Sequence, residues 1–280
     1  MPTNDTQSTK PLPPATRLRQ LLAEKDIVVA PGVYDGFSAR ITLEVGFDCL
    51  YMVGAGISAS KLGQPDLGFA SLNDMREHAE MIANLEPSTP LIADADTGYG
   101  GPNMVARTVA QYHHSTKRCG HLRGKQVVPV DVFVSRITAA VASRKAIGSD
   151  IVIIARTDAL QTHGFDEAIV RLKAAAEAGA DVAFLEGVTS EQEARDVCRF
   201  LAPTPMPQEA KEMGFRIIIF PFAAIAPAYE AIRNTYRSVK ESGRTGVDPN
   251  FTPKQLFTIV GLKEATAIDL AAGGNLYGKV

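Results

Sequence analysis

Two aspartates follow a short apolar run in the first half of the chain. Residues 91–93 predict a buried strand, which leads into Asp94 and Asp96 and then into the glycine-rich residues 97–101. Because residues two apart on a strand face the same side, we expect the two carboxylates to lie together. Mg²⁺ prefers oxygen ligands of this kind, whereas paired carboxylates without a cation are unfavourable in apolar surroundings. The motif therefore predicts a divalent-cation site, with two solvated aspartates in a turn as the alternative.

A cysteine further along the chain lies among cations. The thiol of Cys119 has basic and glycine neighbours in sequence: Lys117, Arg118, Gly120 and His121. Positive neighbours stabilise a thiolate, so a cysteine in this setting can act as a nucleophile or as a proton donor. Glycines on its C-terminal side allow a loop that adapts as an active-site lid does. The alternative is a basic surface loop that happens to contain a cysteine.

An arginine and a glutamate are also candidates for binding or catalysis. Arg156 lies near the end of the clearest predicted strand, residues 149–158, and its planar guanidinium suits bidentate pairing with a substrate carboxylate. Glu186 ends the next predicted strand and can balance a metal ion or position Arg156. An internal salt bridge from Arg156 to Asp158 or Glu186 is the alternative. Cys49 and Cys198 lie in a predicted strand and helix, which indicates core thiols.

Strands and helices alternate over about 250 residues, which is typical of a (β/α)₈ TIM-type barrel. Strands are predicted for residues 26–31, 47–53, 91–93, 149–158, 181–187 and 215–221. Helices are predicted for residues 15–25, 37–44, 71–85, 103–114, 131–147, 165–178, 190–201, 223–242, 252–260 and 262–272. A doubly wound open sheet is the alternative, but no GxGxxG sequence follows the first strand. Candidate site residues collect after the strand ends, as on the catalytic face of a barrel.

The predicted barrel lacks two of its eight strands. The only apolar run between the fourth and fifth predicted helices is residues 126–130, where Pro129 disfavours an interior strand. Residues 202–210, after the seventh predicted helix, contain three prolines and also predict no strand. We therefore expect an α/β barrel without strands 4 and 7.

Composition limits the class of protein. The chain has 280 residues, 45% of them hydrophobic, with Lys+Arg 29 against Asp+Glu 31. Near-neutral charge gives no reason to expect nucleic acid or an anionic membrane as a partner, and no apolar run is long enough to span a bilayer. Three scattered cysteines favour neither a disulfide framework nor a zinc site, and we expect a cytoplasmic protein. We predict a disordered lead at 1–14, a barrel at 15–250 and a helical extension at 251–280.

Six motifs in order give the chain, from about Leu18 onward, a strong resemblance to the isocitrate lyase/phosphoenolpyruvate mutase superfamily. They are Pro31-Gly32-Val33-Tyr34-Asp35, Lys61-Leu62-Gly63-Gln64-Pro65-Asp66, Asp94-Ala95-Asp96-Thr97-Gly98-Tyr99-Gly100, Lys117-Arg118-Cys119-Gly120-His121, Ile154-Ala155-Arg156-Thr157-Asp158 and Leu185-Glu186-Gly187. The branch it resembles most contains fungal oxaloacetate hydrolase and 2,3-dimethylmalate lyase, with 2-methylisocitrate lyase next. Val53 stands where the methylisocitrate branch has serine, and the cysteine loop is similar to that of the C–C lyases and unlike that of the phosphonomutases.

The resemblance implies roles for individual residues. Asp94 and Asp96 would bind Mg²⁺, with Mn²⁺ as a substitute and Asp66 in the outer shell. Tyr51, Gly54 and Ala55 would hold the substrate's carboxylate and its keto or hydroxyl end. The remaining residues that the resemblance assigns to catalysis or substrate binding are Arg156 with its partner Glu186, the acid Cys119, and its neighbours Lys117, Arg118, Gly120 and His121.

The implied reaction is a Mg²⁺-dependent retro-aldol or retro-Claisen cleavage of a small 2-hydroxy or 2-oxo di- or tricarboxylate. The resemblance also implies a homotetramer whose C-terminal helices, within residues 252–272, swap between subunits.

Two departures match the two missing strands: the family's metal-shell glutamate before the cysteine loop and its substrate-contacting asparagine are both absent. A working lyase with a patched barrel, a non-catalytic relative, a truncated splice or gene-model product and a phosphonomutase are the hypotheses considered.

Overall fold

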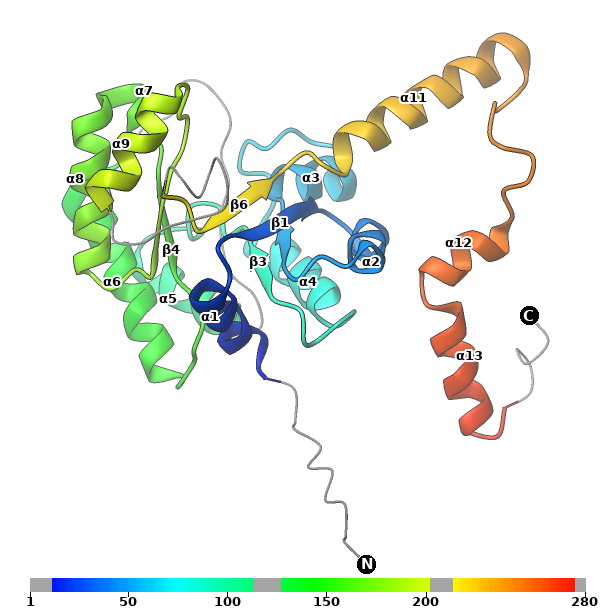
Figure 1. Cartoon of the computed structure of the whole chain (residues 1–280), viewed down its shortest axis with the longest axis horizontal. Coiled ribbons are helices and arrows are strands. Elements are labelled where there is room, and N and C mark those ends of the chain that lie inside the picture. Colours follow the sequence, from blue (N-terminus) through cyan, green and yellow to red (C-terminus); the bar gives the residue numbers. More distant parts are fainter. Residues whose placement is uncertain (1–11, 113–126, 202–213, 275–280) are drawn as a thin grey trace, which may run out of the picture.

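Parallel strands surrounded by helices make up the body of the protein. The computed structural model describes residues 12–112, 127–201 and 214–274 (Figure 1). Its strands are β1 (Val28–Val33), β2 (Leu50–Met52), β3 (Leu91–Ala93), β4 (Ile154–Thr157), β5 (Val182–Leu185) and β6 (Ile217–Phe220). Each corresponds to one of the predicted strands. Apolar runs located them, although the run that predicted β4 begins at Ile151, before the strand itself.

The strands form two parallel sheets. The larger has the order β3-β2-β1-β6 and the smaller has the order β4-β5. Val28 of β1 lies opposite Ile217 of β6, so the first strand is hydrogen-bonded to the last described one, as in a closed barrel. The described residues contain no strand that joins β3 to β4 or β5 to β6. Residues 127–129, where Pro129 disfavours a strand, are irregular, and α6 begins at Val130.

Helices follow the strands at nearly all the predicted places. The helices before the fifth strand are α1 (Pro14–Glu24), α2 (Gly36–Val45), α3 (Gly54–Ile57), η1 (Ser58–Leu62), α4 (Leu72–Ala83), α5 (Pro102–Gln111), α6 (Val130–Ala146), α7 (Leu160–His163) and α8 (Phe165–Glu177). The later ones are α9 (Glu191–Leu201), α11 (Ile225–Ser242), α12 (Pro253–Ile259) and α13 (Leu262–Ala271). Capping boxes begin α2 at Asp35 and α4 at Ser71, and Gly46 ends α2 in the left-handed conformation.

The sequence was interpreted incorrectly after β2. Residues 54–62, for which neither a helix nor a strand was predicted, form the helical turn α3 and the five-residue π-helix η1. Close packing explains why glycine is needed there, since a Cβ on Gly56 would lie 2.6 Å from Cβ of Tyr34. Such π-helical turns are rare and are frequently found at functional sites.

Alternate residues of β2 face two different cores. Leu50 and Met52 pack with α2 and α4 outside the sheet, whereas Cys49, Tyr51 and Val53 pack inside it. The inner cluster also takes in buried residues of α1, β1, β3 and the segment before β4: Leu21, Val28, Ile92 and Val152. Side chains from both sheets therefore fill one interior, and this shared core holds the two sheets together.

Helix α1 lies across the N-terminal ends of the strands. Arg216, just before β6, donates hydrogen bonds to the carbonyl oxygens of Leu22 and Lys25, and Lys25 forms an ion pair with Asp48 before β2. The N-terminal ends of the larger sheet are thereby covered. Loops at the opposite, carboxyl ends are left to form a site.

A network of charges extends this cover to the smaller sheet. Asp181, just before β5, accepts from Arg19 of α1 at 3.0 Å, from Arg144 of α6, and from the backbone amide of Ile153 at 2.8 Å. Arg19 also donates to the carbonyl oxygen of Ile151 at 3.1 Å. One carboxylate thus connects a helix at the start of the chain with both strands of the smaller sheet.

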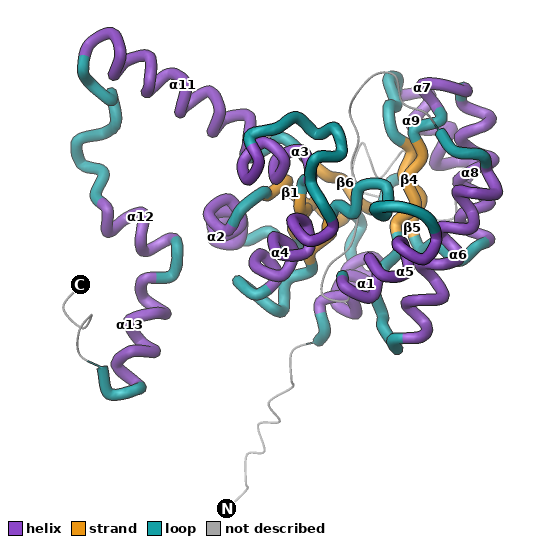
Figure 2. The backbone as a smooth tube through the Cα atoms, turned by 180° about the vertical axis from the view of Figure 1, so that it is seen from behind, coloured by secondary structure: helices purple, strands orange, loops and turns teal. Residues whose placement is uncertain are grey.

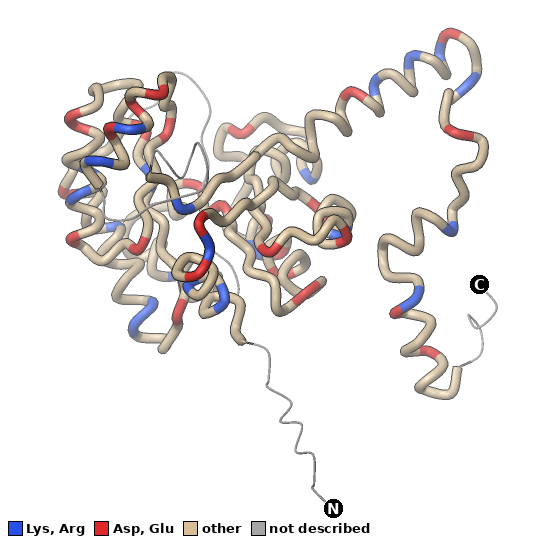
Figure 3. The backbone as a smooth tube through the Cα atoms, in the orientation of Figure 1, with Lys and Arg blue, Asp and Glu red and all other residues tan. Residues whose placement is uncertain are grey.

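The last three helices lie apart from the strands. Figures 1 and 2 show α11 leading away from β6, with α12 returning beside α2 and α13 following it on the outer side. None of the three contains a buried residue. Acidic and basic residues are interspersed along α11 and the helices around β4 (Figure 3). No helix among the described residues is long and apolar enough to cross a bilayer.

Replacing Asp181 with alanine should test the network below the strands. We expect the free energy of unfolding to fall by about 1–3 kcal/mol, because two arginines and one buried amide lose their shared acceptor. Urea unfolding followed by circular dichroism measures this. Glu177→Ala, at an exposed position on α8, should change the value by less than about 0.5 kcal/mol. An equal loss in both variants would contradict the proposed contribution of Asp181.

Candidate active site at the carboxyl ends of the strands

Asp94 directly follows β3 and is the most deeply buried of the predicted metal ligands. Its side chain accepts hydrogen bonds from the backbone amides of Asp96, at 2.9 Å, and Gly54, at 3.1 Å. Only 1% of the residue is exposed. A Cβ on Gly54 would lie 2.8 Å from Oδ2 of Asp94, so the approach of the two segments requires glycine. The carboxylate is therefore fixed in one orientation by two backbone donors.

Asp96 lies near Asp94 for a different reason from the one that the sequence suggested. The strand ends at Ala93, and Asp96 has a left-handed backbone with φ of 46°. The rule that alternate strand residues share a face therefore does not extend to this pair. A tight turn brings them together, and the backbone amide of Asp96 binds the Asp94 carboxylate. Aspartate tolerates the left-handed region better than most residues do.

Two tyrosines adjoin the aspartates. Burial raises the pKa of Tyr99 and of Tyr112, and the negative charges of Asp94 and Asp96 raise both further. The two phenols therefore stay protonated at neutral pH. Two carboxylates therefore lie beside two largely buried phenols, in poorly hydrated surroundings. Oxygen donors in such surroundings fit a hard divalent cation.

Arg156 is held on several sides at the end of β4. Its Nε donates to Asp158 at 2.8 Å, and its Nη2 lies 3.1 Å from Oε2 of Glu186. The guanidinium also stacks over the ring of Phe184, 5.2 Å from its centroid. The parallel register places Phe184 beside Arg156 in the neighbouring strand. The internal ion pairs expected as an alternative are thus present, and they hold the guanidinium in one plane.

The other described candidates lie at different depths. Tyr51 is completely buried in the inner core, Ala55 is half-buried in α3, and Asp66 is half-buried in the loop after η1. No three Asp, Glu, His or Cys residues within the described ranges are grouped so as to hold a metal ion. Asp66 therefore does not join Asp94 and Asp96 in a single cluster, and its outer-shell role stays a prediction.

The cysteine loop lies outside the described residues. This applies to all five of its candidates, namely Lys117, Arg118, Cys119, Gly120 and His121. The two remaining cysteines behave as core thiols. Burial raises the pKa of Cys49 to about 12 and that of the half-buried Cys198 to about 11. Neither is a reactive thiolate at neutral pH.

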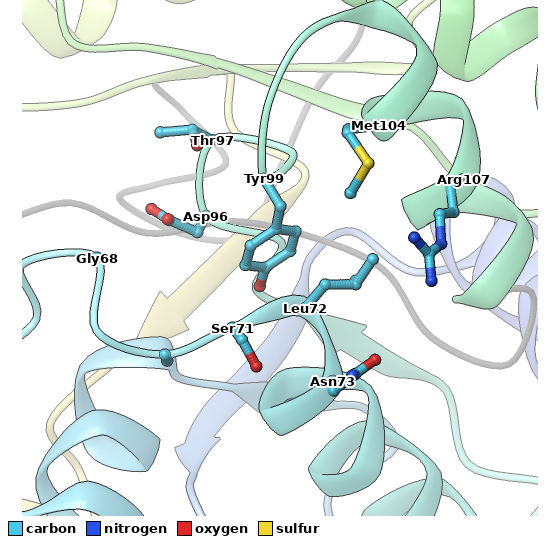
Figure 4. A pocket seen from close by; sticks show the side chains of 10 residues that line it. Gly68, Ser71, Leu72, Asn73, Asp96, Thr97, Tyr99, Met104 and Arg107 are labelled. Carbon is cyan, nitrogen blue, oxygen red and sulfur yellow. The ribbon is translucent and has the colours of Figure 1, made fainter.

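A cavity of about 560 Å³ adjoins the turn that contains Asp96. Figure 4 shows Tyr99 within it, between Asp96 on one side and Met104 and Arg107 of α5 on the other. Three residues near the site were missed by sequence reasoning: Tyr99, Tyr112 and Phe184. Tyr99 stood in a quoted motif and could have been singled out, whereas Tyr112 and Phe184 show no local pattern that marks a site.

A family model and a curated relative both match most of this chain. A family model described as phosphoenolpyruvate phosphomutase matches residues 18–240. The 2,3-dimethylmalate lyase of Eubacterium barkeri is 34% identical, and the match covers 91% of this chain and 96% of that protein. Its alignment runs over 282 residues while using 91% of a 280-residue chain, so the relative has residues without a counterpart here.

Solved structures agree with these relatives. A trigonal crystal structure of 2,3-dimethylmalate lyase is 54% identical, with a TM-score of 0.90 over 96% of this chain and 98% of that chain. An oxaloacetate acetylhydrolase with the inhibitor 3,3-difluorooxalacetate is 50% identical, with a TM-score of 0.90 over 95% and 99%. A phosphonopyruvate hydrolase with oxalate and Mg²⁺ is 25% identical, with a TM-score of 0.81 over 92% and 99%.

Proposed function

The chain belongs to the phosphoenolpyruvate mutase/isocitrate lyase superfamily, and on this basis we propose that it cleaves carbon–carbon bonds with Mg²⁺. The substrate would be a small 2-hydroxy or 2-oxo di- or tricarboxylate. The observation that carries this proposal is Asp94, a buried carboxylate fixed by two backbone amides at the end of β3. The proteins to which the chain is similar include lyases and a hydrolase that act on acids of this class.

Asp94 and Asp96 would hold the cation, with Asp66 as an outer partner. When bound, Mg²⁺ would supply a Lewis acid that polarises the substrate's hydroxyl or keto oxygen. Carboxylate oxygens, together with water and substrate oxygens, form the usual magnesium shell. The burial of Asp94 and its 2.9 Å hydrogen bond from the backbone amide of Asp96, which holds the two residues together, support this assignment.

Arg156 would bind a substrate carboxylate and stabilise the negative charge that develops on cleavage. Its contacts with Asp158 and Glu186 restrain the guanidinium before substrate arrives. Tyr51, Gly54 and Ala55 would hold the substrate's carboxylate and its keto or hydroxyl end. Cys119 would protonate the carbanion left by cleavage, and the rest of its loop (Lys117, Arg118, Gly120 and His121) would bind substrate and complete the acid's surroundings.

The relatives also guide the choice of substrate. Oxaloacetate and 2,3-dimethylmalate are the acids named by the solved structures at 49–54% identity. We place 2-methylisocitrate behind them because Val53 replaces the serine of that branch. Phosphonomutase activity is disfavoured by the cysteine loop, although the family model bears that name.

A catalytically impaired or truncated relative is the second candidate. Among the described residues, no strand joins β3 to β4 or β5 to β6, which supports this candidate. The 2,3-dimethylmalate lyase of Eubacterium barkeri also has residues that match nothing in this chain. Strand edges without partners favour aggregation and local opening. On this view the chain keeps the binding residues while it has lost turnover.

Purified protein should be tested on oxaloacetate, 2,3-dimethylmalate and 2-methylisocitrate. We expect Mg²⁺-dependent release of oxalate or an oxo acid from at least one of them, abolished by EDTA and restored by Mg²⁺ or Mn²⁺. Enzyme-coupled oxalate and keto-acid assays measure the products. Folded protein that binds Mn²⁺ without cleaving any of the three would support the impaired-enzyme candidate instead.

Cys119→Ser should lower turnover about 10²- to 10⁴-fold, because a hydroxyl is a much weaker acid than a thiol. Cation binding, measured by calorimetry without substrate, should stay unchanged. Cys198→Ser is the matched control, since the pKa of Cys198 is raised by burial to about 11, and it should keep its activity. Full turnover in the Cys119 variant would remove this cysteine from the mechanism.

We further propose that the chain forms a homo-oligomer, a tetramer in the family's pattern, through its last three helices. One face of α11 carries an exposed apolar stripe at intervals of three and four residues: Tyr229, Ile232, Tyr236 and Val239. A helix with such a stripe normally buries it against a partner. A second copy of this chain is the partner that the resemblance implies.

Light scattering with size-exclusion chromatography should therefore find a tetramer at micromolar concentration. Ile232→Asp should shift the mass toward smaller species, because it places a charge within the stripe. Asn234→Asp adds the same charge on the opposite face of α11 and should leave the mass unchanged. A monomeric wild-type protein would refute the proposal.

A further inference from the structure

The residue that follows helix α5 contacts the turn that precedes the helix. Tyr112, which directly follows α5, is 1% exposed, and its hydroxyl donates to the backbone carbonyl oxygen of Asp94 at 3.3 Å. The hydroxyl of Tyr99, within the turn, lies 3.3 Å from that of Tyr112. Two phenols thus form a chain from the turn to the carbonyl of its first aspartate.

This turn has an unfavourable backbone. Asp96 and Tyr99, with φ of 46° and 58°, are the only residues other than glycine with positive φ in the described parts of the chain. A bulky aromatic residue is rarely found in this region of conformational space. Such conformations persist where the surrounding structure fixes them, and they cluster at binding sites.

The contacts that fix the turn come from one side. The Tyr99 ring packs against the core outside the sheet, which contains Leu50, Met52 and Tyr112. The hydroxyl of Thr108 lies 3.3 Å from the carbonyl oxygen of Gly98. Figure 4 shows the Tyr99 hydroxyl directed away from the Asp96 carboxylate. The tyrosines therefore support the backbone of the turn, whereas the amides of Gly54 and Asp96 hold the Asp94 carboxylate.

We propose that the Tyr99–Tyr112 pair positions Asp94 and Asp96 and so sets the affinity of this turn for a divalent cation. This inference rests on the proposed function, since it concerns the same cation site. Both tyrosines are positioning residues that act through Asp94. The Tyr112 hydroxyl is the one that contacts Asp94, and Tyr99 lies one hydrogen bond behind it.

The test is Mn²⁺ binding to the full chain without substrate, measured by electron paramagnetic resonance and calorimetry. Tyr112→Phe removes one hydroxyl and keeps the ring, and it should weaken Mn²⁺ binding about tenfold, as loss of a partner behind a metal ligand does. Tyr99→Phe, one step further from Asp94, should weaken binding about threefold. Excess Mn²⁺ should restore most of the turnover in both variants.

Three comparison variants separate positioning from general destabilisation. Ile169→Val loosens the core around α8 far from the turn and should lower the melting temperature without changing Mn²⁺ affinity. Tyr229→Phe removes a hydroxyl on α11, outside the turn, and should leave the Mn²⁺ affinity unchanged. Gly54→Ala pushes directly on Asp94 and should weaken Mn²⁺ binding at least as much as Tyr112→Phe does.

The two proposals fail in different ways. Wild-type Mn²⁺ affinity in both folded tyrosine variants would overturn the role of the pair while leaving the metal site intact. Asp94→Asn and Asp96→Asn that bind Mn²⁺ as tightly as the wild type would overturn the metal site itself. A wild-type chain that binds no Mn²⁺ would overturn both proposals.

Discussion

The pairing of β1 with β6 is the contact on which the rest of the structure depends. Four consecutive residues from Val28 to Pro31 lie opposite residues 217–220, so the first and last described strands of the chain are joined by a parallel ladder. The ladder brings Arg216 under α1, and α1 then covers the N-terminal ends of the strands. With that side closed, the loops at the carboxyl ends are the ones that can form a site. Asp94, Arg156 and Glu186 all occur there.

The charged residues of the site are supported in two different ways. Asp94 relies on backbone amides, which need no counter-charge and cannot rearrange without moving the chain. Arg156 relies on two carboxylates and an aromatic ring, although removing charges from water is costly and such pairs contribute little net stability. A buried ion group of this kind is better explained by the need for a guanidinium in a defined orientation. Stability alone would favour apolar residues at the same positions.

The sequence predicted the strands and most helices because each carries a local signal. Asp35 and Ser71 begin helices with capping boxes, and apolar runs with flanking turn residues locate the strands. The helical turns after β2 were missed because residues 54–62 are too short and too rich in small residues to show a period of 3.6. The left-handed backbone of Asp96 was not predicted, because the glycine-rich residues 97–101 indicate a turn without showing which neighbouring residue takes positive φ. Tyr112 was missed because its contact with Asp94 depends on the direction in which α5 packs after the turn, which the sequence does not show.

The site residues are divided between the two sheets. Among the described residues no strand joins β3 to β4 or β5 to β6, so the relative position of the two sheets determines the geometry of the site. Asp94 belongs to the larger sheet, whereas Arg156 and Glu186 belong to the smaller one. In a complete barrel, hydrogen-bonded strands would fix the distance between such residues. Among the residues that the structure describes, that distance instead depends on the shared inner core and on Arg19, which reaches from α1 to Asp181.

Side-chain packing resists shear between two sheets less strictly than a strand ladder does. An error of about 1 Å in a catalytic geometry can cost about 10²-fold in rate. The binding residues on each sheet can therefore remain well formed while turnover depends on how firmly the core and α1 hold the sheets together.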